Sequence, residues 1–146
     1  LDEMEKIYIK TRDISRENSA IDLRKDFGKQ LNDLLLGYKN SKVNIITRNL
    51  SKMPWDGISE MKKTAIYRVL QELMTNMRKH SHATFVTLVF EKEGKKIHIN
   101  YRDNGVGCDL FKKNGLQHTE SRITSINGTI NFESKQGDGF KASIII

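Results

Sequence analysis

The chain of 146 residues has the length of one domain with a single hydrophobic core. Its 37% hydrophobic and 29% charged residues exclude a disordered chain, and no apolar run reaches the length of a membrane-spanning helix. The formal net charge of +7 indicates a basic surface that can attract nucleic acid, membranes or anionic small molecules, although most of its lysines and arginines are expected to be solvated surface residues. The single cysteine, Cys108, excludes an internal disulfide bond.

The first predicted elements are two helices. Residues 1–18 carry apolar residues on one helical face among many charges, and they have little core of their own. Because the chain begins at Leu1, we expect this helix to be the end of a longer one in a longer protein. Asp22 is expected to cap the second helix, and Gly37 fits just past its end.

A strand and a longer amphipathic helix are expected next. Residues 42–48 predict the strand. A loop follows, with the only proline and the only tryptophan of the chain. Ser59 is expected to cap the third helix, and residues 66–80 give that helix a strong apolar stripe.

The second half of the chain predicts two hairpins separated by a loop and a short helix. The strands are expected at residues 84–91, 96–102, 129–134 and 140–146. Residues 103–115 are expected to form a flexible loop, and residues 116–127 a helix that Gly128 ends.

The interleaved helices and hairpins indicate an α+β fold. We expect a two-layer α/β sandwich, with a mixed, largely antiparallel sheet and helices on one face. The only candidate domain boundary lies near residues 18–22, so the main domain is expected to span residues 22–146.

Four groups of polar and glycine residues lie at the ends of these elements. Glu72 and Asn76 are four residues apart on the third helix and therefore share one face. Lys79 and His80, at the end of that helix, belong to the same group. The other three groups are Asp103-x-Gly105-x-Gly107 after a strand, Asn114-Gly115-Leu116 opening a helix, and Gly137-x-Gly139 before the last strand. Each group alone is more often a solvated helix face or a turn. The ordered set indicates a site that holds adenine with an acid and a magnesium-phosphate group with an asparagine.

These groups closely resemble the catalytic ATP-binding domain of sensor histidine kinases, within the gyrase and histidine-kinase ATPase superfamily. The N box of that family is matched by Tyr67-Arg68-Val69-Leu70-Gln71-Glu72-Leu73 through Asn76 and by Lys79-His80-Ser81-His82-Ala83. The resemblance covers roughly Asp22 to Ile146, is closest to the nitrate-sensor and lipid-fluidity-sensor branch, and implies a Bergerat-type ATP-binding fold. Residues 1–18 look like the C-terminal tail of the family's dimerisation helix.

The resemblance implies a role for each group in binding ATP and Mg²⁺. Asn76 would give its side-chain oxygen to Mg²⁺, and Glu72 would hold a metal-bound water or polarise the reacting groups. Lys79 or His80 would lie near the phosphates. Asp103 would accept a hydrogen bond from the adenine amino group, which favours ATP over GTP.

The glycine groups would shape the rest of the pocket. Gly105 and Gly107 would let the backbone pass close to the base. Asn114, Gly115 and Leu116 would open a helix whose amides bind phosphate, and Thr119 would add a hydroxyl. Gly137 and Gly139 would form the floor of the pocket.

The activity implied by the resemblance is that of a two-component protein kinase, which transfers the γ-phosphoryl group of ATP to a histidine. The phosphoacceptor histidine of the family lies on a long helix, and none of the four histidines of this chain lies on such a helix. Among the four, His118 has the sequence context most similar to that of a phosphoacceptor. We therefore expect the acceptor on a separate dimerisation helix, and no autophosphorylation of this chain alone.

The implied partners are those of a two-component system. They are the protein's own dimerisation and phosphoacceptor domain, a second copy in the full-length homodimer, and a response regulator, with no nucleic acid. We expect a cytoplasmic domain, and the resemblance leaves open whether the whole protein is anchored in a membrane.

Three other functions stay open. Lys113 stands where the family usually has a glycine, which is compatible with a degenerate nucleotide-binding scaffold. The superfamily also contains anti-sigma-type serine kinases, although the helical tail at residues 1–18 argues for the histidine-kinase architecture. A basic nucleic-acid-binding domain would fit the net charge, but it would explain none of the four groups.

Overall fold

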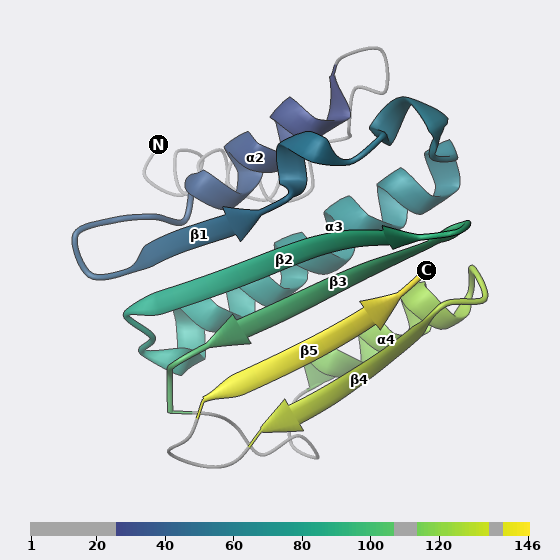
Figure 1. The fold of residues 1–146 in the computed structure, drawn as a ribbon. Coiled ribbons are helices and arrows are strands. Elements are labelled where there is room, and N and C mark those ends of the chain that lie inside the picture. Colours follow the sequence, from purple (N-terminus) through teal and green to yellow (C-terminus); the bar gives the residue numbers. More distant parts are fainter. Residues whose placement is uncertain (1–25, 107–113, 135–138) are drawn as a thin grey trace, which may run out of the picture.

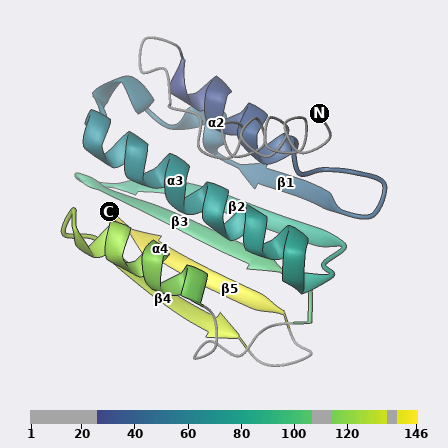
Figure 2. The same ribbon diagram turned by 180° about the vertical axis from the view of Figure 1, so that it is seen from behind.

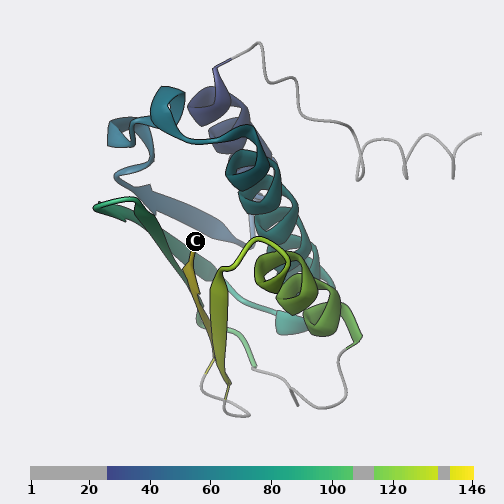
Figure 3. The ribbon, with the colours of Figure 1, turned by 90° about the vertical axis from the view of Figure 1, so that its right-hand side faces the viewer.

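The computed structural model of the chain describes residues 26–106, 114–134 and 139–146. These residues form two layers: a five-stranded sheet, and helices that cover one of its faces (Figure 1, Figure 3). The predicted α+β class, with a mixed sheet and helices on one face, is confirmed. The expected tail at residues 1–18 and the expected domain start at residue 22 lie outside the described residues.

Three α-helices make up the helical layer of the described chain. Their bounds are Phe27–Leu36 for α2, Glu60–Asn76 for α3 and Asn114–Thr124 for α4. A π-helical turn over Met77–Ser81 extends α3. The third predicted helix therefore exists, and it begins at the residue after the predicted cap.

Side chains cap the first turns of α2 and α3. The Ser59 hydroxyl accepts a hydrogen bond from the amide of Lys62 at 3.3 Å, as predicted. The Asp26 carboxylate does the same for the amide of Lys29 at 3.3 Å. The predicted cap at Asp22 is wrong, because Asp26 supplies an acceptor directly before the apolar stripe of α2.

The strands form a sheet in the order β1-β2-β3-β5-β4. Their bounds are Asn44–Arg48 for β1, Phe85–Glu93 for β2, Lys96–Asp103 for β3, Thr129–Ser134 for β4 and Phe140–Ile145 for β5. Both predicted hairpins, β2–β3 and β4–β5, are confirmed as antiparallel pairs. β1 and β2 are parallel, and α3 makes the crossover that a parallel pair requires.

The core lies between the sheet and the helices. Alternate residues of β2 and β3 point into it, as the two-residue period of a strand requires. These residues are Val86, Leu88, Phe90, Ile97, Ile99 and Tyr101. Trp55 closes the core before the start of α3: its ring centroid lies 4.9 Å from that of Phe27 and 6.1 Å from that of Phe90.

No described helix covers the other face of the sheet (Figure 3). This face carries the strand residues that alternate with the core, such as the half-buried His98 and the exposed Arg102. Among the described helices, none is both long enough and apolar enough to cross a membrane.

Candidate functional site

Four elements that are distant in sequence approach one end of the sandwich. Figures 1 and 2 show that the C-terminal ends of α3 and β3 lie toward this end, together with the starts of α4 and β5. α3 and α4 run in opposite directions, so the end of one lies toward the start of the other (Figure 2). The strand and helix directions thus bring the described residues of the four predicted groups toward the same end of the molecule.

Asp103 is the last residue of β3, where it pairs with Val86 of β2 and Phe140 of β5. The prediction of a flexible loop from residue 103 is wrong at this position, because pairing on both sides extends the strand through Asp103. Its side chain is only 4% exposed. Oδ1 accepts a hydrogen bond from the Gly105 amide at 2.9 Å, and Oδ2 accepts one from the Tyr101 hydroxyl at 2.7 Å. These donors satisfy a carboxylate that burial would otherwise destabilise.

Gly139 lies directly against the backbone of Asp103. Its φ of +88° is in the left-handed range, and a Cβ atom there would overlap the carbonyl oxygen of Asp103. Both observations require glycine at this position. The backbone before β5 therefore packs closely on the residue predicted to bind the base. Gly107 and Gly137 lie outside the described residues.

The predicted metal-binding residues lie on the C-terminal part of α3. Asn76 is the last residue of α3, half-buried, and its side chain does not cap the following turn. Lys79 is exposed on the π-helical turn, which also contains His80, whose side chain lies outside the described residues. π-helical turns often occur at functional sites, because they change the direction of side chains within a helix.

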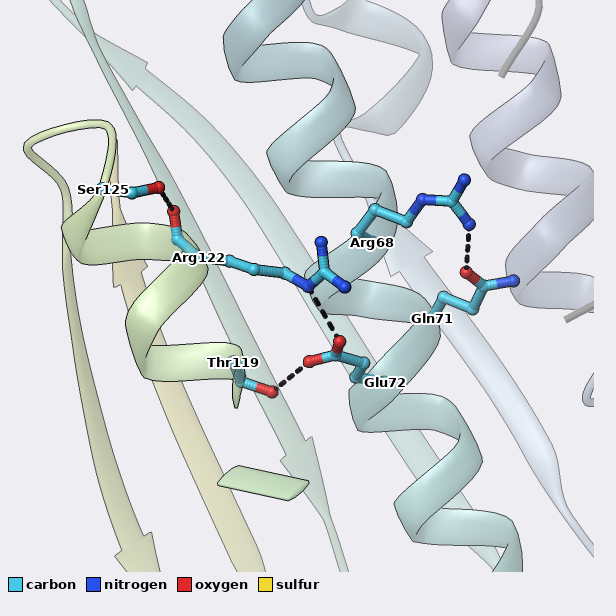
Figure 4. Close-up of polar contacts among 6 residues, drawn as sticks. All are labelled: Arg68, Gln71, Glu72, Thr119, Arg122 and Ser125. Atoms are coloured by element: carbon cyan, nitrogen blue, oxygen red, sulfur yellow. Dashed lines mark hydrogen bonds and ion pairs between the residues drawn. The ribbon is translucent and has the colours of Figure 1, made fainter. Parts of the chain in front are cut away.

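Glu72 joins α3 to α4 through two hydrogen bonds (Figure 4). Its Oε2 accepts from the Thr119 hydroxyl at 2.6 Å, and its Oε1 accepts from Arg122 Nε at 2.9 Å. Thr119 is fully buried, whereas the side chain of Arg122 is 49% exposed. Sequence reasoning missed Arg122, although its spacing of three residues from Thr119 puts both on one face of α4.

The first turn of α4 contains the third predicted group. α4 begins at Asn114, so Asn114, Gly115 and Leu116 are its first residues, and the helix starts earlier than expected. The first amides of a helix have no partner within it, and they carry a partial positive charge that suits an anion. The backbone therefore has the chemistry of a phosphate site at this point, while the side chains of residues 114–117 lie outside the described part of the chain.

Asn104 is a second residue whose role sequence reasoning missed. Its Oδ1 accepts from the amides of Thr84 and Phe85, at 2.9 and 3.0 Å, and its Nδ2 donates to the Thr84 hydroxyl at 2.9 Å. These bonds attach the chain that leaves α3 to the end of β3. The Asn104 carboxamide thus holds the residue after Asp103 against the start of β2.

The sequence is similar to segments of sensor histidine kinases. It is 37% identical to sensor histidine kinase ComP of Bacillus subtilis over 87 residues. This match covers 56% of this chain and 11% of ComP. It is 30% identical to the signal transduction histidine-protein kinase/phosphatase DegS of Bacillus subtilis over 107 residues. This match covers 68% of this chain and 28% of DegS. The chain therefore spans a minor part of the length of these relatives. No established protein-family profile matches it.

A solved structure has the same arrangement of helices and strands. The histidine kinase domain of the Erythrobacter litoralis blue-light activated histidine kinase superposes with a TM-score of 0.62 over 82% of this chain and 62% of that one. The identity is 13%, so this likeness establishes the fold. The sequence relatives confirm the predicted resemblance to sensor histidine kinases, and the solved structure confirms the fold; the branch within the family remains a prediction. The chain is a relative of the sensor histidine kinases, and its described residues have the α+β fold of a histidine kinase domain.

Proposed function

We propose that the chain is the ATP-binding, catalytic part of a sensor histidine kinase. In the proposed reaction a histidine nitrogen forms a bond to the γ-phosphorus of ATP while the bond to the bridging oxygen breaks, which leaves ADP and a phosphohistidine. The acceptor histidine would lie on a separate dimerisation helix. The observation that carries the proposal is Asp103, a buried acid with fixed donors at the end of a strand where three other predicted groups converge.

The proposed base contact follows from the chemistry of the Asp103 carboxylate. Its two oxygens offer about four acceptor positions, and the Gly105 amide and the Tyr101 hydroxyl fill two of them. The remaining positions fit the amino group of adenine and repel the carbonyl oxygen that guanine presents there. Gly105 and Gly139 would let the backbone approach the base closely.

The phosphates and Mg²⁺ would lie between the end of α3 and the start of α4. The Asn76 side-chain oxygen is a hard ligand that suits Mg²⁺, and Glu72 keeps acceptor positions for a metal-bound water beside its bonds to α4. Lys79, His80 and the first amides of α4, at Asn114, Gly115 and Leu116, would face the phosphates, with Thr119 contributing through Glu72. When bound, Mg²⁺ would neutralise charge on the phosphoryl oxygens.

The proposed partners follow from the relatives that are named as sensor histidine kinases. They are a dimerisation and phosphoacceptor domain of the same protein, a second copy of it, and a response regulator that takes the phosphoryl group from the histidine. The proposal keeps the expected branch, that of nitrate and lipid-fluidity sensors.

The test is a calorimetric titration with Mg²⁺ and a non-hydrolysable ATP analogue. The wild-type chain should bind saturably, and Asp103→Asn should weaken binding more than about tenfold, because the amide group replaces an acceptor oxygen with a donor. Asp56→Asn is the matched control: it makes the same change at an exposed residue before the start of α3, and it should bind like the wild type. Melting curves of all three proteins check that each is folded.

If the wild type and Asp103→Asn bind the ATP analogue with equal affinity, the proposed contact between Asp103 and adenine is wrong. Absence of saturable binding by a folded wild-type chain would favour the alternative of a degenerate nucleotide-binding scaffold.

A further inference from the structure

Tyr101 is a buried tyrosine whose hydroxyl is directed at the proposed base pocket. It lies two residues before Asp103 on β3, so both side chains are on the core face of the strand. Tyr101 is 1% exposed, and its ring meets that of Phe140 edge-on, with centroids 6.0 Å apart and planes at 66°. Phe140 in turn contacts Phe132, with centroids 5.8 Å apart. This aromatic row holds the Tyr101 hydroxyl in one position.

The hydroxyl and the Gly105 amide together fix the orientation of the carboxylate. Each donates to a different oxygen of Asp103, at 2.7 Å from the hydroxyl and 2.9 Å from the amide. With one donor on each oxygen, rotation of the carboxylate would break a short charge-assisted bond. Each oxygen still keeps a position for one more donor. The free acceptor positions therefore have a defined direction before any ligand arrives.

The protonation state of Tyr101 keeps this arrangement constant. Burial, followed by the neighbouring charge of Asp103 and the hydrogen bond to it, raises the pKa of the Tyr101 hydroxyl far above its usual value of 10.0. A raised pKa favours the protonated hydroxyl, which is the form that donates to Asp103. A phenylalanine in its place would keep the ring packing and leave Oδ2 without this donor.

We propose that Tyr101 is a positioning residue that sets nucleotide specificity: its hydroxyl orients Asp103 so that the free acceptor positions select a base with an exocyclic amino group. The inference rests on the proposed function, in which Asp103 contacts adenine. It extends that function by assigning part of the selectivity to a residue that does not itself contact the nucleotide. Pre-orientation of this kind increases affinity, because the bound geometry need not be ordered on binding.

The test compares two nucleotides that differ only in the exocyclic amino group of the base. Wild type and Tyr101→Phe are titrated with Mg²⁺ and each of two non-hydrolysable triphosphates, one of adenosine and one of purine riboside, which lacks the exocyclic amino group. Tyr101→Phe should weaken binding of the adenosine compound about tenfold, the loss expected for one hydrogen bond to a charged group. Its affinity for the purine riboside compound should stay within about twofold of the wild-type value, because no amino group is present to be oriented.

Tyr38→Phe is the matched control. Tyr38 also makes a part-buried hydroxyl contact, 3.0 Å from the Thr75 hydroxyl, but it lies between α2 and α3 and away from Asp103. This variant should bind both nucleotides like the wild type. Replacement of Tyr101 by p-aminophenylalanine, which keeps the ring and a donor, should recover most of the lost affinity. If Tyr101→Phe does not fold, the selectivity of the p-aminophenylalanine protein decides instead: it should still prefer the adenosine compound as the wild type does.

An equal loss for both nucleotides would make Tyr101 a structural residue only and would overturn the inference. Unchanged or tighter binding of the adenosine compound by Tyr101→Phe would overturn it as well, and so would loss of the preference in the p-aminophenylalanine protein when Tyr101→Phe does not fold. A wild-type protein that binds neither nucleotide would overturn the proposed function first, and this inference with it.

Discussion

At the scale of single residues, the geometry around Asp103 depends on short contacts that permit no additional atom. A Cβ atom added at Gly139 would overlap the carbonyl oxygen of Asp103, and the backbone conformation of Gly139 is one that other residues rarely adopt. Gly94, in the turn between β2 and β3, has a similar positive φ of +61°, but a Cβ atom added there would meet nothing within 4 Å. The two glycines therefore separate the cost of the backbone conformation from the cost of crowding.

Alanine substitution at each glycine measures these two costs. We expect Gly94→Ala to lower the free energy of unfolding by about 1 kcal/mol, the usual cost of a left-handed conformation for a residue with a Cβ atom. Gly139→Ala should cost about 3 kcal/mol or more, because the added atom also meets backbone. Urea unfolding of the two variants and the wild type gives both values. Equal costs would mean that the backbone at Asp103 moves freely to accept the extra atom.

At the scale of elements, α3 and α4 are coupled through Glu72, and the two donors to its carboxylate differ in environment. Thr119 is completely buried, so its hydroxyl has no access to water if the bond is lost. Arg122 and Glu72 are partly exposed, with side chains 49% and 27% accessible, so water screens their attraction. The shorter bond from the buried hydroxyl should therefore hold the two helices together more strongly than the ion pair.

Two substitutions on α4 compare these donors. Thr119→Val keeps the shape of the side chain and should lower the free energy of unfolding by about 2 kcal/mol, because it leaves a carboxylate oxygen without its buried donor. Arg122→Gln should cost less than about 1 kcal/mol. Glu120→Gln, at an exposed position on the same helix, serves as the control with little effect. A larger loss for Arg122→Gln than for Thr119→Val in chemical denaturation would contradict this ranking.

Elements with a strong local signal could be predicted from the sequence. Ser59 and the apolar stripe specify α3, and alternation around a short turn specifies the β2–β3 hairpin. What could not be predicted depends on contacts between distant segments. Asp103 looks like part of a loop until β2 and β5 pair on either side of it, and Arg122 gains a partner only when α4 lies beside Glu72. The binding roles assigned to Asp103, Glu72, Asn76, Lys79 and the glycine groups remain predictions.

At the scale of the whole molecule, the sheet has protected centre strands and two edges. β3 lies in the middle of the order β1-β2-β3-β5-β4, with hydrogen-bonded neighbours on both sides and a buried core face. β4 is an edge strand whose residues alternate between exposed and half-buried. Stability should therefore be distributed unevenly across the sheet.

Amide hydrogen exchange followed by mass spectrometry checks this distribution. Amides of β3 should exchange most slowly, at the rate of global unfolding, and those of β4 should exchange fastest among the strands. The isolated peptide of each strand, measured under the same conditions, corrects for intrinsic exchange rates. Protection of β4 equal to that of β3 would show that the edge strand opens only with the whole sheet.

Trp55 gives this protein a built-in fluorophore that is well separated from the proposed ligand. It is the only tryptophan in the chain, and it lies before the start of α3, whereas Asn76 is the last residue of that helix. At about 1.5 Å per residue, the 17 residues of α3 span about 25 Å. The indole N–H of Trp55 donates to the carbonyl oxygen of Leu50 at 3.0 Å within a buried aromatic cluster. Its emission should therefore shift to longer wavelength when the core opens and stay constant when the far end is occupied. One optical signal then reports folding independently of the calorimetric signal that reports binding.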